Sequence, residues 1–383
     1  FRQKPYELID IQESKIAYHA GATLEQAQPV GHSVIEVNSR EDLQAVLNTN
    51  AGSGKTLFLR AGEYRLKQSL TIPSDIHICG EGRSTVLICE PTIRTAAILL
   101  GDLDAKNITI ENLVVDGSKE HQEAYDPNSG RFYRTGRYSN ALAGISMRGE
   151  AGHAFSNIKL KNLTVINFSR SGVYISDAEG IEIDHCDFTE NGAHVVPGPR
   201  LQHNLMIQHS SNIMIKDSRF DTSIRGCGLV LDHCKSLKVE NCEIARNGWH
   251  GLLMAECHNG KIENCLVEGN DGCGFMGEYL HDGSNLIQIR HNKIQYNNEY
   301  GIRAFGMKET DIKDGTVKKS GRNGFLLRKN CNWNNYNGQM MKTIYSIILV
   351  LFASLSVWAE KYPHILVKDE DKVAVLDKIE KQA

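Results

Sequence analysis

The tetrad Gly228-Leu229-Val230-Leu231 opens the pattern that decides the fold of this 383-residue chain. It returns as Gly251-Leu252-Leu253-Met254, Gly274-Phe275-Met276-Gly277, Gly301-Ile302-Arg303-Ala304 and Gly324-Phe325-Leu326-Leu327. The successive glycines lie 23, 23, 27 and 23 residues apart. A fixed period in the twenties is too short for a domain. It is typical of a solenoid whose units bury a core only by stacking.

A second short strand pattern keeps the same period. It occupies Val239 to Ile244, Ile262 to Val267, Ile289 to Ile294 and Ile312 to Val317. Equivalent residues on stacked parallel strands lie about 4.8 Å apart. We therefore predict a parallel β-solenoid. Asn112, Asn162, Asn241 and Asn264 share one register in it, and we expect their amides to hydrogen-bond from turn to turn.

The N-terminal part adds a cap and the first turns. Ser39 to Leu47 is amphipathic, so we expect a helix with Ser39 as N-cap that covers the open end of the stack. A strand pattern ending in Gly62-Glu63-Tyr64 follows, and then one ending in Gly80-Glu81-Gly82. These first strand patterns resemble the first turns of the pectin-lyase-like superfamily of right-handed parallel β-helices. The resemblance covers about residues 30–327.

The resemblance implies an all-β fold, a right-handed single-stranded parallel β-helix (solenoid) of roughly ten turns with an N-terminal cap helix. We divide the chain into a cap region at 1–55, a parallel β-helix at 56–330 and a non-repeat tail at 331–383.

The tail has a different character. Residues 343–359 form an apolar run that follows Met341-Lys342 and ends at Ala359, as in a secretory signal peptide. The run is shorter than the roughly 20 apolar residues of a membrane span, so we expect no stable span. Residues 360–383 resemble the start of heparinase II/III-like polysaccharide lyases. We interpret 340–383 as a joined second reading frame, with a C-terminal anchor as the alternative.

Composition limits the partners. The chain is 41% hydrophobic with a net charge of −3, which argues against nucleic-acid or anionic-membrane partners. The ten cysteines follow the repeat: Cys242 and Cys265 are one period apart, as are Cys234 and Cys257. We predict columns of buried free thiols rather than disulfides or zinc. We expect a monomer that is secreted, periplasmic or at the cell surface, with its own export signal outside this sequence.

Insertions indicate a binding face. Segments 118–143 and 193–203 both precede a Gly-strand and should project from one edge, while 279–284 should wall the opposite edge. Repeat proteins carry insertions on their binding face, so the Gly-strand sheet is predicted to floor a groove. Residues there that could stack on or grip a sugar acid are Tyr133, Arg134, Arg137, Tyr138, Arg200, Arg225, Tyr279 and Arg303.

Alternation along each Gly-strand places the second and fourth residues after Gly outward, and the next residue begins a turn. The candidate catalytic residues on this face are His209, Asp232, His233, His250, Glu256 and Glu278. A lyase must pair a uronate carboxylate with a cation, remove its α-proton and protonate the leaving oxygen. With the superfamily resemblance, these residues favour β-elimination on a uronate-containing, acidic polysaccharide.

Other activities stay open. A glycoside hydrolase needs two carboxyls, and Asp232 and Glu278 lie two turns apart, about 9.6 Å between backbones. An inverting pair of carboxyl groups is separated by about 6.5–9.5 Å. The superfamily's polygalacturonases carry Gly-His-Gly and paired aspartates, whereas Trp249-His250-Gly251 keeps only half of that triplet.

Two further functions remain open. A uronate epimerase begins with the same proton abstraction as a lyase, and a non-catalytic adhesin or tailspike would bind glycan only. The resemblance also leaves calcium open as a cofactor, although no acidic loop has a recognisable ligand spacing and the metal ligands stay unassigned.

Overall fold

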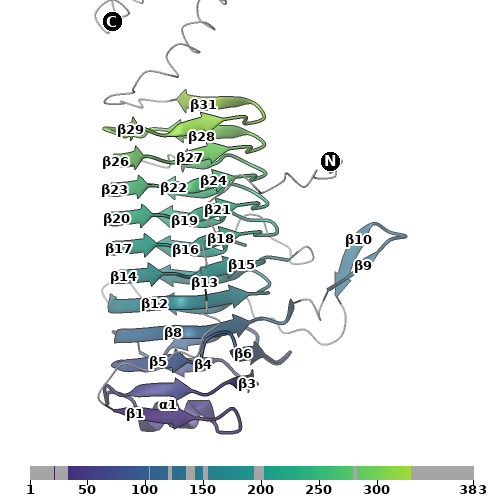
Figure 1. Cartoon of the computed structure of the whole chain (residues 1–383), viewed down its shortest axis with the longest axis vertical. Helices are drawn as coiled ribbons and strands as arrows, with labels where there is room; N and C mark the ends of the chain where they lie inside the picture. The colour runs from purple at the N-terminus through teal and green to yellow at the C-terminus, as the bar shows by residue number, and fades with distance from the viewer. Residues whose placement is uncertain are drawn as a thin grey trace, which may run out of the picture. The chain divides into compact units, whose positions relative to one another are not determined.

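The structure is a computed structural model that describes residues 21, 33–102, 104–119, 123–134, 143–149, 154–193, 202–278 and 283–328. These residues form a right-handed parallel β-solenoid of about 11 turns, which confirms the predicted fold (Figure 1). All of them belong to a compact unit that spans 1–334. The signal-peptide-like segment 343–359 lies outside the described residues.

The predicted Gly-strands form one ten-stranded parallel sheet, which makes one side of each turn. Its strands are β4 (Leu70–Ile72), β7 (Ala96–Leu100), β11 (Ala143–Arg148), β13 (Ser171–Ser176), β16 (Leu205–Gln208), β19 (Leu229–Asp232), β22 (Leu252–Ala255), β25 (Phe275–Glu278), β28 (Tyr300–Phe305) and β31 (Asn323–Arg328). Equivalent residues pair turn to turn, as Met206, Val230 and Leu253 do. The 23-residue step is therefore one turn.

A nineteen-stranded sheet supplies the other sides as two rows of strands. One row has β1 (Val34–Val37), β2 (Thr56–Leu59), β5 (Ile76–Gly80), β14 (Ala178–Asp184), β17 (Ser211–Lys216), β20 (Lys235–Glu240), β23 (His258–Glu263), β26 (Asn285–Arg290) and β29 (Asp311–Lys313). The other has β3 (Gly62–Leu66), β6 (Thr85–Cys89), β15 (Asp187–Thr189), β18 (Arg219–Asp221), β21 (Glu243–Ala245), β24 (Leu266–Glu268), β27 (Lys293–Gln295) and β30 (Thr316–Lys318).

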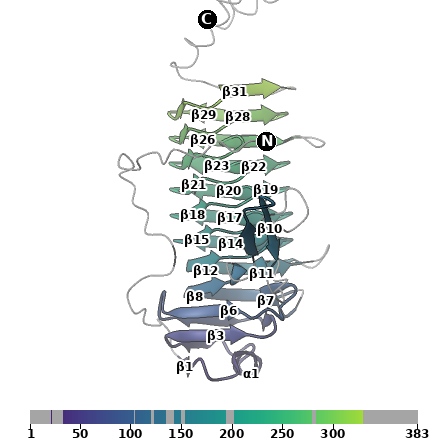
Figure 2. The same ribbon diagram turned by 90° about the vertical axis from the view of Figure 1, so that its right-hand side faces the viewer.

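Two long strands join the rows: β8 (Lys106–Asp116) and β12 (Phe155–Ile166) each pair in both. Inside predicted insertion 118–143, β9 (Glu123–Asp126) and β10 (Arg131–Arg134) form a separate antiparallel hairpin. Figure 2 shows the stack from the side turned by 90°.

The cap helix exists but starts later than predicted. It is α1 (Leu43–Thr49), and its N-cap is Asp42, whose side chain accepts from the Ala45 N–H at 3.1 Å. Ser39 lies before the helix because Asn38 and Glu41 form a turn there, with the Asn38 N–H donating to the Glu41 carboxylate at 2.7 Å. β1 lies within the predicted cap region and already pairs with β2.

The predicted asparagine column is a row of left-handed corners. Asn112, Asn162, Asn241 and Asn264 have φ between 47° and 55°, a conformation that Asn tolerates better than most residues. Among the described residues of this column, the side-chain amide hydrogen bond between successive turns is the one that Asn241 Nδ2 donates to Asp217 Oδ1, at 3.1 Å. The position was correct, but the continuous ladder is elsewhere: Asn112, for example, donates to Cys79 Sγ at 3.6 Å and not to another asparagine of the column.

The continuous amide ladder lies inside the solenoid, just before the Gly-strands. Its hydrogen bonds run from Asn191 to Asn204 at 3.0 Å, from Asn204 to Asn247 at 3.0 Å, from Asn247 to Asn270 at 2.9 Å and from Asn270 to Asn297 at 2.8 Å. All five side chains are almost inaccessible to solvent.

This ladder explains the glycine of the repeat. A Cβ on Gly228, Gly251 or Gly274 would lie 2.6–2.7 Å from the Nδ2 atom of the ladder asparagine in the next turn. Such a contact is too short for any other residue, so Gly leads these three strands.

The core consists of the alternate residues of these strands. Leu229, Leu231, Leu252 and Met254 are completely buried, as the alternation predicted. All cysteines among the described residues are buried and form no disulfide, as predicted for the thiol columns in this part of the chain.

Candidate functional site

The outer face of the Gly-strand sheet carries an apolar strip. Met206, Val230, Leu253 and Met276 occupy the second position after Gly, yet they are at most 8% exposed. They cluster with Cys227, Ala255 and Cys273, and Tyr174, Trp249, Tyr300 and Phe305 pack against them. The predicted groove floor is therefore apolar along this column of residues. Polar side chains occupy the next column of the same face.

From Tyr174, which is in register with the strip, a chain of hydrogen bonds runs across three turns into that neighbouring column. Tyr174 Oη donates to Gln208 Oε1 at 2.6 Å, and Gln208 Nε2 donates to Asp232 Oδ2 at 2.7 Å. The other oxygen, Asp232 Oδ1, lies 2.7 Å from Nδ1 of His233. We call these four residues the Tyr174–His233 chain. They come from β13, β16, β19 and the turn after β19.

The chain sets the tautomer of His233. Because the Asp232 carboxylate can only accept, Nδ1 of His233 carries a proton, and Nε2 of the neutral ring presents a lone pair. The side chain is 39% exposed, so a polymer substrate can reach it. His209, one turn earlier, stacks beside it with ring centroids 5.0 Å apart. This arrangement suits a general base.

Two arginines flank this centre. Arg148 on β11 holds its guanidinium 4.6 Å from the centre of the Tyr174 ring. Arg303 on β28 lies 5.0 Å from the Phe305 ring and 3.8 Å from the Glu299 carboxylate. In the strand order each arginine is three strands from β19, or about 14 Å. A carboxylate on a glycan laid along the sheet could therefore meet a cation on either side of His233.

The structure separates the other predicted catalytic residues from this centre. His250 is 3% exposed, its ring stacks 4.3 Å from that of Trp249, and its Nδ1 accepts the Cys273 N–H at 2.8 Å. Glu256 is 5% exposed and accepts the Gly283 N–H at 2.9 Å. Both contacts are typical of structural turn residues.

Glu278 is partly exposed at the end of β25 and shares a column with Asp232, two turns away, as the sequence predicted. Both oxygens of Asp232 are already engaged by Gln208 and His233, however. This leaves Asp232 suited to orienting a histidine rather than to acting as a hydrolase acid or base.

The predicted substrate-binding residues fall in several places. Arg225 is exposed in the turn before β19, and Arg303 lies on the Gly-strand face. Tyr133 and Arg134 belong to β10, but their side chains lie outside the described part, as do residues Arg137, Tyr138, Arg200 and Tyr279 altogether. Sequence reasoning missed Arg148, Tyr174 and Gln208 as site residues. Arg148 and Gln208 share the register of Asp232, and Tyr174 shares that of Met206; these outward registers were the available signal.

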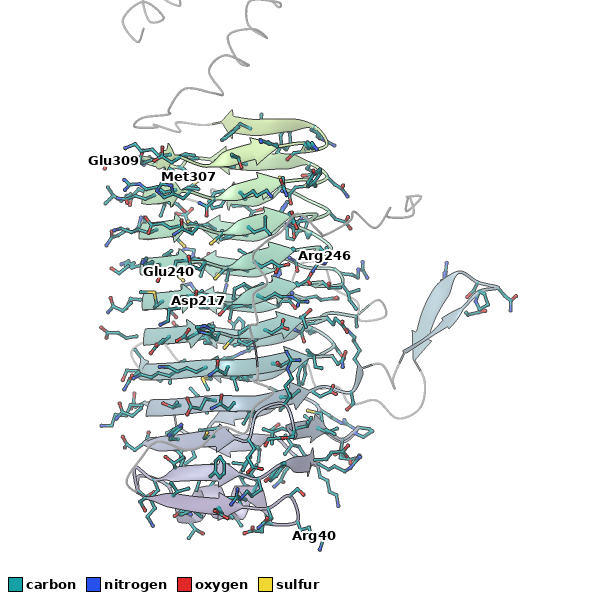
Figure 3. All side chains as sticks on the ribbon, in the orientation of Figure 1. Arg40, Asp217, Glu240, Arg246, Met307 and Glu309 are labelled. Carbon is teal, nitrogen blue, oxygen red and sulfur yellow. The ribbon has the colours of Figure 1, made fainter. Side chains whose placement is uncertain are left out.

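A second charged cluster lies on the row of β15, β18 and β21. Arg219 Nη2 is 2.8 Å from Asp221 Oδ2, and its Nε is 3.8 Å from Asp187 Oδ1. Arg246, labelled in Figure 3, also contacts Asp221. The backbone at Gly21 lies against Asp187: a Cβ there would lie 2.8 Å from Asp187 Cβ. A glycan could not reach Asp187, so the cluster is structural.

The covered carboxyl makes stability depend on pH. Burial raises the pKa of Asp187 from 3.8 to about 6, partly offset by Arg219. Since the pKa is higher in the folded state, ionisation of Asp187 destabilises the fold. The cost is absent below pH 3.8 and complete above pH 6. A shift of this size corresponds to about 3 kcal/mol.

Asp187→Asn should therefore raise the free energy of unfolding relative to wild type by up to about 3 kcal/mol more at pH 7 than at pH 4. Urea unfolding of both proteins at the two pH values measures this difference. The exposed Asp102→Asn is the control and should show no such change between them. Equal effects of Asp187→Asn at both pH values would contradict the assignment.

Comparisons with known proteins agree with this geometry at the level of fold. The family model described as "Right handed beta helix region" matches residues 96–278 and 201–340. Among curated proteins no sequence matches the chain. Within the described residues, no helix has the length and apolar character needed to cross a bilayer.

Solved structures resemble the chain at low identity. The surface adhesin PfbA of Streptococcus pneumoniae is 11% identical, with 78% of this chain and 83% of that chain covered and a TM-score of 0.53. The A-module of the Azotobacter vinelandii mannuronan C-5 epimerase AlgE4 is 16% identical, with 78% and 93% covered and a TM-score of 0.45. A Yersinia enterocolitica family 28 exopolygalacturonase is 12% identical, with 78% and 76% covered and a TM-score of 0.43. The match to PfbA, at a TM-score of 0.53 and 11% identity, supports the fold alone.

Proposed function

The chain belongs to the right-handed β-helix family, and from that premise we propose that it cleaves a uronate-containing polysaccharide by β-elimination on its Gly-strand face. The observation that carries the proposal is the Tyr174–His233 chain, which prepares an accessible histidine as a base. A polymer substrate lies outside the cell, so the proposal includes export or surface display. It also includes a monomeric solenoid.

The chemistry assigns a role to each residue. Arg148, three strands from β19 and about 14 Å away in the strand order, pairs with the carboxylate of another uronate along the polymer and so holds the polymer over His233. The proton to be removed is on the carbon beside the carboxylate of the uronate at His233. His233 Nε2 takes that proton, and Asp232 stabilises the resulting imidazolium. The electrons of the broken C–H bond form a carbon–carbon double bond, and the glycosidic C–O bond breaks. His209, stacked on His233, protonates the leaving oxygen.

The engagement of Asp232 and the burial of Asp187 favour elimination over hydrolysis. Asp232 is held by Gln208 and His233, and Asp187, whose pKa is raised, lies under the backbone at Gly21. A uronate epimerase is the second candidate, because the same base would begin that reaction and return of a proton to the other face would complete it.

The test is digestion of a panel of soluble uronate polymers. A rise in ultraviolet absorbance from an unsaturated uronide, together with chain shortening, supports the lyase. New reducing ends without that absorbance would indicate a hydrolase, and altered uronate composition by NMR without cleavage an epimerase. Binding of glycan with no change in it would leave an adhesin. The last three outcomes each overturn β-elimination.

Arg148→Ala should lower kcat/KM by about 10–100-fold, the loss of one charge-assisted hydrogen-bonding partner. Arg148→Lys should restore only part of it, since Lys lacks the planar fork that pairs with a carboxylate and stacks on Tyr174. Initial-rate kinetics on the active polymer measure both variants. Arg40→Ala, at the N-terminal end in Figure 3, is the matched control and should retain full activity. Equal rates for all three variants would remove Arg148 from the site.

A further inference from the structure

Three groups of histidine, cysteine and acidic side chains converge among the described residues, each with donor atoms within 4.8 Å of one another. They are His77–Cys79–Glu111, His250–Cys273–Glu299 and Asp184–His185–Asp217. Their hydrogen bonds decide which of them could bind a metal ion, because each ligand must direct a lone pair at it.

The groups at His250 and at His185 fail this requirement. His250 Nδ1 already accepts the Cys273 N–H at 2.8 Å, so the neutral ring carries its proton on Nε2 and offers no second lone pair. At the other group, Asp184 Oδ1 lies 2.5 Å from His185 Nδ1, and Asp184 Oδ2 lies 3.1 Å from Lys216 Nζ. A lysine cation already balances that carboxylate.

The group at His77 meets the requirement. His77 and Cys79 are alternate residues of β5 on the same side, and Glu111 pairs with Cys79 in register on β8. Thr56 Oγ1, one turn earlier, lies 3.0 Å from His77 Nδ1. When Nδ1–H donates to Thr56, the Nε2 lone pair faces Glu111 Oε1 at 2.8 Å. In the other tautomer Nε2–H donates to Glu111 and Thr56 Oγ1–H donates to Nδ1, so an ion would bind by moving the ring proton from Nε2 to Nδ1.

The sulfur completes a mixed donor set. Cys79 is fully buried, and Asn112 Nδ2 donates to its Sγ at 3.6 Å; a metal ion would displace the thiol proton on binding. The side chains of His77 and Glu111 are 24% and 21% exposed, so an ion could enter and keep a water molecule. The second-shell contact of Thr56 with the ring is the kind that orients a ligating histidine.

We propose that His77, Cys79 and Glu111 bind one Zn²⁺ ion, with water as the fourth ligand. One nitrogen, one sulfur and one oxygen ligand suit zinc, whereas calcium and magnesium take oxygen ligands. Zinc bonds of about 2.0–2.3 Å hold tetrahedral ligands about 3.3–3.6 Å apart. Side-chain rotation can bring donors now within 4.8 Å to that spacing. Because the ligands come from two turns near the N-terminal end, the ion ties those turns together.

The test uses the full chain, freed of metal with a chelator and then titrated with Co²⁺ and Zn²⁺. We expect one ion per chain, a thiolate-to-Co²⁺ charge-transfer band that Zn²⁺ abolishes, and a higher Tm with Zn²⁺. Cys79→Ser should remove the band. Thr56→Val should keep it and lower the Zn²⁺ affinity by about 10–100-fold, as loss of an orienting contact does.

Cys273→Ser and His250→Gln, in the group excluded above, are the matched controls and should leave the titration unchanged. Glu111→Gln gives a second ligand variant with a smaller change in packing than Cys79→Ser, and should weaken binding. The proposal is wrong if no stoichiometric binding occurs, or if the band survives Cys79→Ser and disappears in Cys273→Ser.

Discussion

Replacing His233 with Gln should lower kcat on the uronate polymer by about 10²–10⁴-fold while KM changes little. This is the usual contribution of a general base that acts only in the transition state. Gln can still hydrogen-bond to the Asp232 carboxylate, so the fold around β19 should persist. Initial-rate kinetics, with near-native unfolding of the variant as a check, measure the effect.

A matched control exists on another side of the solenoid. His185 forms the same kind of pair with the preceding residue, Asp184 Oδ1, at 2.5 Å. His185→Gln should therefore leave kcat unchanged. Asp232→Asn should also reduce kcat, since the amide no longer fixes the tautomer of His233. The double variant Asp232→Asn, His233→Gln should be no slower than His233→Gln alone, because the two residues act as a unit. Independent, multiplying effects would contradict the coupled pair.

Asn247→Ala should destabilise the solenoid by about 3–5 kcal/mol. The Asn247 side chain accepts from Ser223 N and Asn204 Nδ2, both at 3.0 Å, and donates to Phe220 O at 3.1 Å and Asn270 Oδ1 at 2.9 Å. Removing it leaves buried partners unsatisfied, each costing about 1–3 kcal/mol. Equilibrium unfolding in urea measures the loss.

Asn298→Ala tests whether burial is the cause. Asn298 lies beside the ladder residue Asn297, but its side chain is exposed and donates to Asp271 Oδ1 at 2.9 Å. We expect a change within about 0.5 kcal/mol for this surface substitution. Similar losses in Asn247→Ala and Asn298→Ala would mean that the ladder contributes nothing beyond an ordinary hydrogen bond.

The repeat allowed the fold to be predicted because its signals are local. Alternation within Leu229 to Leu231 needs only the strand backbone, and the 23-residue step needs only a turn of constant length. The ladder was assigned to the wrong asparagines, although an asparagine four residues before Gly251, Gly274 and Gly301 was visible in the sequence. Which asparagine points inward depends on the backbone at each corner, where Asn241 has φ 53°.

The site could be predicted only as a set of candidates. Asp232 and His233 were chosen because they end a Gly-strand, but in a continuing strand their side chains would point to opposite sides. The left-handed backbone of His233, with φ 52°, turns its ring back to the Asp232 carboxylate. In the sequence, His250 was as good a candidate base as His233. Its burial against Trp249 and Cys273 became visible only in the folded structure, where Cys273 comes from the next turn.

By itself, the sequence determined that this chain is a parallel β-solenoid, because glycine spacing and apolar alternation recur within each turn. Only the tertiary structure decided where a site can be. It brought Tyr174 to Gln208 from 34 residues away and Gln208 to Asp232 from 24 residues away, through pairing between turns, and laid Gly21 over Asp187. Such hydrogen bonds and coverings depend on which turns become neighbours, and no short stretch of sequence encodes that.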